Sequence, residues 1–231
     1  MNTAIIVAGG TGNRFGSERP KQFLEILGKP IIQYSLERFD AAPSVDSIIV
    51  VVAGSELENF TRLVAGFRQS KVERVVAGGT TRAESVANGL RAIDRECGVV
   101  AVHDAARPLV TVDEIERTIA AASECGAACL TAPVTDTIKQ VDGERITETL
   151  DRNVLRRALT PQAFKFELLK KAFAAAADLG ANVTDESFLV EMLGHPVAAV
   201  PGSTMNVKIT LPEDLIVVEA FIRKGNSDKY E

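Results

Sequence analysis

Short apolar runs alternate along this chain with longer segments in which apolar residues recur every three or four positions. Short runs of this kind are typical of buried strands, and the periodic segments are typical of helices that cover a sheet. The alternation therefore predicts a Rossmann-like α/β fold, with a mostly parallel sheet and flanking helices. The predicted strands cover residues 4–8, 48–52, 72–77, 99–103, 127–133, 196–200 and 207–210.

Capping residues mark where several of the predicted helices begin. Three segments, 55–58, 81–84 and 111–114, have the spacing of a capping box, in which the first and last residues bond each other's backbone reciprocally. They predict helices from 55 to about 69, from 81, and from 111 to about 126. Further helices are expected at 30–39, 166–180, 185–193 and 212–223. We expect a single domain over residues 1–225 and a flexible polar tail at 226–231.

Residues 137–149 interrupt the alternation with two polar strands on either side of Asp142-Gly143. This dipeptide favours the tight turn of a hairpin. Because an isolated two-stranded hairpin is only marginally stable in water, it needs support from elsewhere. We predict a protruding β-arm at about 136–151 that packs on a second copy of the chain and forms a homodimer. The alternative is a flap folded on its own domain.

The first predicted strand leads into a loop that is rich in glycine and in cations. Glycine allows the backbone to adopt positive φ and to approach a ligand closely. Backbone N–H groups turned inward by such a loop, with cations nearby, form an anion site, and the expected guest is a polyphosphate. The residues concerned are Gly9, Gly10, Gly12, Gly16, Arg14, Arg19 and Lys21.

Two familiar phosphate-binding patterns do not fit this loop. A dinucleotide fingerprint needs a third glycine where Phe15 stands, and an acidic residue after the second strand, which is followed by Ala53-Gly54. A P-loop needs Lys-Ser/Thr after its second glycine, and Gly16 is followed by Ser17-Glu18. From composition alone, a glycine-rich surface turn with solvated charges remains the alternative.

The string Ala-Gly-Gly-Thr-Gly-Asn-Arg-Phe-Gly, followed by Pro-Lys-Gln-Phe, resembles the signature of nucleotidyltransferases that join a sugar or polyol phosphate to a nucleotide. Within that superfamily the chain most resembles the 2-C-methyl-D-erythritol 4-phosphate cytidylyltransferase family. Later segments match in order and spacing: 104–108 (Asp-Ala-Ala-Arg-Pro), 151–153 (Asp-Arg-Asn), 159–162 (Leu-Thr-Pro-Gln), 184–186 (Thr-Asp-Glu) and 208–215 (Lys-Ile-Thr-Leu-Pro-Glu-Asp-Leu).

The resemblance implies that an oxygen of methylerythritol phosphate attacks the α-phosphorus of CTP and expels pyrophosphate. It implies catalytic roles for Arg14, Lys21, Arg152 and Lys208. The nucleotide contacts implied are Ala8, Gly9, Gly10, Gly12, Gly79, Thr80, Ser85 and Asp104. The polyol phosphate contacts implied, some of them from a neighbouring subunit, are Arg107, Thr137, Arg152, Thr160, Thr184 and Lys208.

Asp104 directly follows the fourth predicted strand. Open α/β sheets bind ligands at the carboxyl ends of their strands. A carboxylate opposite a triphosphate would be repelled unless a cation lay between them, so Asp104 is predicted to bind Mg²⁺ directly or through water. The alternative is a loop carboxylate paired with Arg107. His103 is interpreted as structural, and Thr81 and Thr184 can act simply as helix caps.

The composition of the chain limits the kinds of partner and ligand that can be expected. The net charge is 26 − 31 = −5 with no polybasic run, which argues against a duplex nucleic acid partner. We expect no membrane span and no signal peptide, hence a cytoplasmic protein. Cys97, Cys125 and Cys129 are odd in number and, with only two histidines, do not suggest a zinc site.

The polyol remains open at this stage. The Ala8-Gly9-Gly10-Thr11-Gly12 form also resembles relatives that use ribitol 5-phosphate, whereas the 104–108 and 151–153 segments favour methylerythritol phosphate. A ribitol-5-phosphate cytidylyltransferase is therefore the main alternative. A catalytically inactive nucleotide-binding module and a nicotinamide oxidoreductase are weaker ones.

Overall fold

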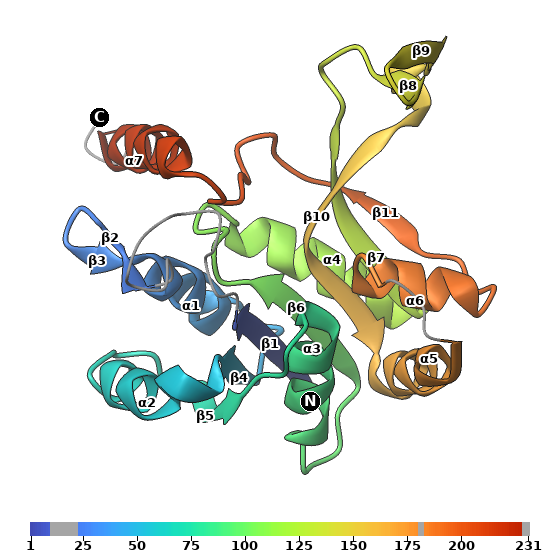
Figure 1. Ribbon diagram of the computed structural model, residues 1–231. Helices are drawn as coiled ribbons and strands as arrows, with labels where there is room; N and C mark the ends of the chain where they lie inside the picture. The colour runs from blue at the N-terminus through green and yellow to red at the C-terminus, as the bar shows by residue number, and fades with distance from the viewer. Residues whose placement is uncertain (10–22, 180–182, 228–231) are drawn as a thin grey trace.

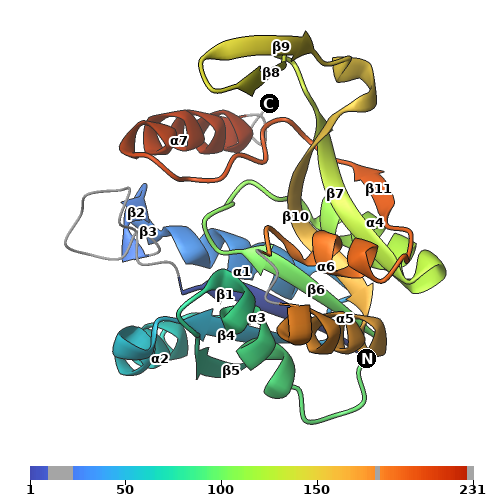
Figure 2. The same ribbon diagram turned by 45° about the vertical axis from the view of Figure 1, so that its right-hand side comes forward.

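The computed structural model describes residues 1–9, 23–179 and 183–227. Its centre is a seven-stranded sheet in the order β11-β7-β10-β6-β1-β4-β5, with helices on both faces (Figures 1 and 2). The strands are β1 (Asn2–Ala8), β4 (Ser47–Val52), β5 (Val72–Ala77), β6 (Val99–Asp104), β7 (Ala127–Pro133), β10 (Arg156–Lys165) and β11 (Ala198–Pro201). The helices are α1 (Ile31–Ala41), α2 (Leu57–Ala65), α3 (Arg82–Arg91), α4 (Val112–Cys125), α5 (Phe166–Leu179), α6 (Glu186–Met192) and α7 (Pro212–Ser227).

The alternation of side chains along the central strands builds two separate cores. Ile6 and Val50 point to the face covered by α1, α2 and α4. Ile5 and Val51 point to the opposite face, which α3, α5 and α6 cover. A strand that is buried on both faces must be apolar throughout, which is why these strands read as continuous apolar runs. Within the described part of the chain, no helix is long and apolar enough to cross a membrane.

The sheet is mostly parallel, as predicted. Strand β1 pairs in parallel with β4 and β6, and β7 pairs in parallel with β11. The exception is β10, which is antiparallel to both β6 and β7 and was not predicted. Pro161 lies inside it, and a proline normally argues against a central strand because it cannot donate to the ladder. The register shifts between Ala158 and Gln162, and this irregularity accommodates the proline.

Three helix starts test the predicted capping boxes. Thr111 and Glu114 form the full box at α4. At α3, Thr81 accepts from the Glu84 N–H, while the Glu84 carboxylate accepts from the backbone N–H and the hydroxyl of Thr80 at 2.6 and 2.7 Å. The third prediction is wrong, because residues 54–56 form a 3₁₀ turn and α2 begins at Leu57 without a side-chain cap and ends at Ala65.

The C-terminal part differs from prediction at two places. Residues 207–210 were predicted as a strand, but they form a loop whose Ile209 N–H donates to the Ala106 carbonyl at 2.9 Å. Helix α7 begins at Pro212 as predicted and continues to Ser227, so the first two residues of the predicted tail are helical. Two short strands, β2 (Glu25–Ile26) and β3 (Lys29–Pro30), were not predicted.

The predicted hairpin is present as β8 (Lys139–Asp142) and β9 (Arg145–Thr149), which stand off from the main sheet (Figures 1 and 2). Asp142 pairs with Arg145, so the turn centres on Gly143, with φ of 56°, and Glu144, one residue later than predicted. Every residue of both strands is exposed, so the hairpin does not pack on its own domain.

Candidate active site at the carboxyl ends of the strands

The first part of the site forms where β1 and β4 end beside the start of α3. A methyl group added at Gly9 would come within 3.2 Å of Ser85 Oγ, and one added at Gly78 within 2.6 Å of the same atom. Ser85 is buried, accepts from the Gly79 N–H at 3.1 Å and donates to the Thr81 carbonyl at 2.9 Å. Its hydroxyl therefore joins the Gly78-Gly79 turn to α3, and only glycine allows so close an approach.

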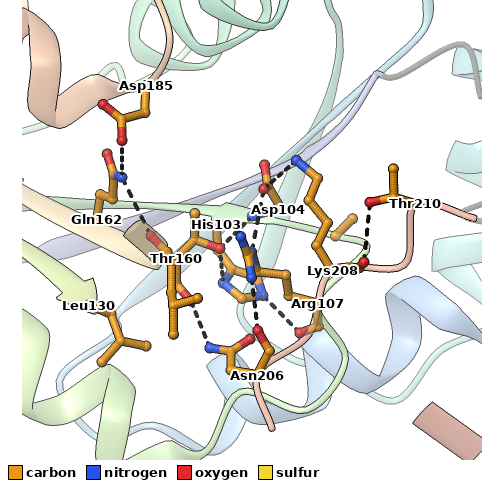
Figure 3. Close-up of polar contacts among 12 residues, drawn as sticks. His103, Asp104, Arg107, Leu130, Thr160, Gln162, Asp185, Asn206, Lys208 and Thr210 are labelled. Atoms are coloured by element: carbon orange, nitrogen blue, oxygen red, sulfur yellow. Dashed lines mark hydrogen bonds and ion pairs between the residues drawn. The ribbon is translucent and has the colours of Figure 1, made fainter. Parts of the chain in front are cut away.

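Asp104 is the centre of the second part, because three cations surround it: Arg107 from the same turn, and Arg82 and Lys208 from distant segments. Figure 3 shows Asp104 beside Arg107 and Lys208. Arg82 Nε lies 3.0 Å from Asp104 Oδ1, and Lys208 Nζ lies 2.7 Å from Oδ2. Arg107 Nε lies 3.6 Å from the same Oδ2. The carboxylate itself is 9% exposed, whereas the Lys208 side chain is 37% exposed and reaches solvent.

The three neighbouring cations determine the charge of Asp104. Burial alone would raise the pKa of its carboxyl, but Arg82, Lys208 and Arg107 hold the pKa well below its usual range. Asp104 is therefore ionised at neutral pH. The ion pair with Arg107 that the alternative prediction named is present, although Arg107 is the most distant of the three cations. This pair does not test the predicted binding of Mg²⁺.

Arg82 also connects the site to α6. Its Nη1 lies 2.6 Å from Glu186 Oε1, and Glu186 is completely buried. Burial raises the pKa of Glu186 and Arg82 opposes this shift, while the two carboxylates together raise the pKa of Arg82 despite its burial. Glu186 Oε2 is buried without a hydrogen-bond partner. Neither Arg82 nor Glu186 was predicted as a site residue.

His103 lies behind Asp104, completely buried against the Phe39 ring at a centroid distance of 4.9 Å. Burial lowers the pKa of His103 to about 3, with Asp104 and Arg107 acting in opposite directions, so the ring is neutral. It contacts Thr160 Oγ1 at 3.0 Å and the Arg107 carbonyl at 3.2 Å (Figure 3). The interpretation of His103 as a structural, hydrogen-bonded residue agrees with these contacts.

Thr160 and Thr184 were predicted to contact the polyol phosphate. Thr160 is buried, and its hydroxyl is engaged by the Asp104 N–H at 3.1 Å and by His103. Thr184 is exposed next to α6, but the cap of that helix is Asp185, whose side chain accepts from the Phe188 N–H at 3.0 Å. The suggested capping role of Thr184 is therefore wrong, and its exposure leaves it open to a ligand.

The remaining predicted residues fall into three groups. Thr80 and Gly79 lie at the exposed turn before α3, and Ala8 is buried at the end of β1. Thr137 and Arg152 are exposed at the base of the arm, where Arg152 donates to the Thr135 carbonyl at 2.6 Å; among the described contacts neither side chain bonds the Asp104 cluster. The predictions for Gly10, Gly12, Arg14 and Lys21 concern residues outside the part of the chain that the structure describes.

Asp104 is the one predicted metal ligand of this site. Over residues 1–9, 23–179 and 183–227 there is no group of three or more His, Cys, Asp or Glu side chains that could hold a metal. Both Asp104 oxygens accept from cationic side chains. Mg²⁺ is commonly bound by one or two carboxylates together with substrate phosphates and several waters, so this donor set fits an ion that arrives with a triphosphate.

A mostly parallel sheet that gathers glycine turns, a helix N-terminus and a cluster of cations at its carboxyl edge is typical of a nucleotide-binding α/β protein. The chain belongs to the 2-C-methyl-D-erythritol 4-phosphate cytidylyltransferase family, whose model matches residues 2–224. Members of this family are nucleotidyltransferases.

Individual proteins and solved structures that are similar to this chain belong to the same family. The Clostridium tetani 2-C-methyl-D-erythritol 4-phosphate cytidylyltransferase is 42% identical over 229 residues, which cover 99% of this chain and 93% of the relative. That of Bacillus velezensis is 43% identical over 221 residues, covering 95% and 94%. The crystal structure of 4-diphosphocytidyl-2C-methyl-D-erythritol synthase from Anaerococcus prevotii has a TM-score of 0.85 at 28% identity, covering 96% and 95%. The Thermus thermophilus cytidylyltransferase has a TM-score of 0.78 at 31% identity, covering 96% and 100%.

Proposed function

We propose that this protein transfers CMP from CTP to 2-C-methyl-D-erythritol 4-phosphate, giving 4-diphosphocytidyl-2-C-methyl-D-erythritol and pyrophosphate for isoprenoid precursor synthesis. Family membership supports the reaction. The observation that carries the proposal is the cluster of Arg82, Arg107 and Lys208 within 3.6 Å of Asp104, at the strand edge where nucleotides bind.

The chemistry suits such a site. The attacking group is a phosphate that is already anionic, so no general base is needed, and the buried neutral His103 is not placed to act as one. The obstacle is that two anions must meet while more charge develops on the α-phosphate oxygens. Positioned cations and N–H donors lower this barrier. Lys208 is the most exposed of the three cations, and with Arg152 it is proposed to hold the attacking phosphate in line.

The other assignments extend the same argument. Arg14 and Lys21 are proposed to stabilise the α-phosphate and the leaving group, and the first glycine loop to bind the triphosphate. Arg107, Thr160 and Thr184 are proposed to orient the polyol phosphate, Thr160 through the buried network that it shares with His103. Mg²⁺ is proposed as the cofactor, held by CTP phosphates and by Asp104; it supplies further neutralisation of the triphosphate.

We further propose a homodimer formed through the arm. Val141 and Ile146 are 60% and 64% exposed on β8 and β9, and a partner that covers them would supply the support that a two-stranded hairpin needs. Thr137 and Arg152 at the arm's base would then be available to the partner's site. A cytoplasmic location is proposed from the free cysteines Cys97, Cys125 and Cys129. The net charge of −5 gives no support for a nucleic acid partner.

A substrate panel tests the reaction. The purified protein is incubated with CTP and Mg²⁺, and pyrophosphate release is measured with methylerythritol phosphate and, separately, with ribitol 5-phosphate. We expect release with methylerythritol phosphate, and the cytidylyl product in the same reaction by mass spectrometry. Faster pyrophosphate release with ribitol 5-phosphate would make ribitol 5-phosphate the substrate in place of methylerythritol phosphate. No release with either polyol phosphate would refute the proposal. Charge reversal at Arg14 and Lys21 should abolish the signal.

A further inference from the structure

A buried hydrogen-bond chain lies directly behind the turn that carries Asp104 and Arg107 (Figure 3). His103 on β6 is 0% exposed, and Thr160 on the neighbouring β10 is 4% exposed. The Asp104 N–H donates to Thr160 Oγ1 at 3.1 Å, and this oxygen lies 3.0 Å from His103 Nδ1. The other ring nitrogen, Nε2, lies 3.2 Å from the carbonyl oxygen of Arg107.

The available donors fix the direction of each bond. A carbonyl oxygen can only accept, so His103 Nε2 must carry a proton and donate it to Arg107. In the neutral ring Nδ1 is then an acceptor, and the single proton of the Thr160 hydroxyl must point toward it. The opposite tautomer would place Nε2 and the Arg107 carbonyl as two acceptors 3.2 Å apart. One neutral arrangement therefore satisfies every atom of the chain.

We propose that His103, as the Nε2–H tautomer, is a positioning residue that sets Asp104 and Arg107 for the reaction. The inference rests on the proposed function, which places these two side chains in the active site. The turn itself is closed by the Arg107 N–H, which donates to the Asp104 carbonyl at 3.0 Å. The ring holds the Asp104 end of this turn through Thr160 and holds the Arg107 end directly. Thr160 thus acts by fixing the turn, because its proton is committed to the ring.

The same chain extends toward Lys208. Asn206 Nδ2 donates to the Thr160 carbonyl at 3.1 Å, and Arg107 Nη1 donates to the Asn206 carbonyl at 2.8 Å. Loop 206–208, which has no strand partner to fix it, is thereby tied to the same two residues that the ring holds. The geometry of two of the three cations around Asp104 consequently depends on the Thr160–His103 pair.

Nitrogen-15 NMR of the full-length wild-type protein tests the tautomer. The chain has two histidines, and His195, which lies between α6 and β11, serves as the internal reference. We expect His103 to show a protonated Nε2 and an unprotonated, hydrogen-bonded Nδ1, and Thr160→Val to shift the Nδ1 resonance selectively. A protonated Nδ1, alone or together with a protonated Nε2, would overturn the proposal.

Kinetics test the positioning role. Thr160→Val and His103→Phe should each lower kcat by about 10- to 100-fold, the usual effect of removing a group that orients a functional side chain. Thr160→Ser, which keeps the hydroxyl, should restore most of the rate, and the double variant should lose no more than the worse single variant. His195→Gln is the matched control and should behave as wild type.

Two outcomes separate the possible failures. If His103→Phe does not fold, the Val and Ser variants of Thr160 decide the matter, and a folded Thr160→Val enzyme with wild-type kcat refutes the inference. If the wild-type protein releases no pyrophosphate from CTP with either polyol phosphate, the proposed function fails, whatever tautomer the spectrum shows.

Discussion

Replacing Arg82 by methionine should destabilise the protein far more than the loss of an ordinary surface cation. Arg82 is 28% exposed and connects Asp104, 9% exposed, to Glu186, 0% exposed. Methionine keeps much of the side-chain volume but leaves two buried carboxylates without their shared counter-ion. Breaking a buried ion pair by removing one partner costs about 3–5 kcal/mol, because the remaining charge stays buried. We expect a loss of unfolding free energy in that range near pH 8, measured by urea denaturation.

The loss should depend on pH, and its sign follows from Glu186. Burial raises the pKa of Glu186 even when Arg82 is present, and removing the cation raises it further. A carboxyl whose pKa is higher in the folded state than in the unfolded state binds more protons when folded. Stability therefore falls as pH rises from the unfolded pKa through the folded pKa. The variant should be less impaired at pH 5.5 than at pH 8.

Two further proteins make this test decisive. Adding Glu186→Gln to Arg82→Met removes the unpaired charge and should recover a large part of the loss at pH 8, since the two changes act on one interaction. Arg62→Met removes a cation from an exposed pair with Glu58, 70% and 87% exposed, and should cost less than about 1 kcal/mol. If Arg82→Met loses no more than Arg62→Met, or if the second substitution recovers nothing, Arg82 does not neutralise buried charge and the reasoning is refuted.

Three other consequences can be measured directly. Lys208→Met should lower kcat/KM by about 10²–10³-fold, because the side chain is a positioned cation that reaches solvent; wild-type kinetics would remove Lys208 from the mechanism. The depressed pKa of Asp104 contributes stability that is present above its unfolded pKa and is lost as pH falls through the folded pKa, so Asp104→Asn should flatten the acid side of the pH–stability curve. Val141→Asp with Ile146→Asp should shift sedimentation from dimer to monomer, and an unchanged dimer would place the interface elsewhere.

Much of the fold was predictable because the physical signal was local. A strand buried on both faces has to be apolar along nearly its whole length, so the prediction of 48–52 located β4 to within one residue. Strand β10 was not predicted because Pro161 and the polar Thr160 and Gln162 interrupt the apolar pattern. Thr160 and Gln162 are buried by residues distant in sequence, and the sequence pattern does not indicate those contacts. Residues 207–210 mislead for the opposite reason. They alternate like a strand, but no neighbouring strand pairs with them.

In the candidate site, too, contacts between residues close in sequence could be predicted and contacts between distant residues could not. Asp104 and Arg107 are close in sequence, so their pairing could be weighed in advance, and the position of Asp104 at a strand end already indicated a ligand edge. Arg82 and Glu186 are 104 positions apart, and nothing in their spacing links them. Each could be explained locally, one in the first turn of α3 and the other in the first turn of α6. Only the packing of these two helix starts around Asp104 shows that Asp104 and Glu186 share one cation. That shared cation is why a substitution at Arg82 should affect both the stability of the fold and the charge on which the proposed reaction depends.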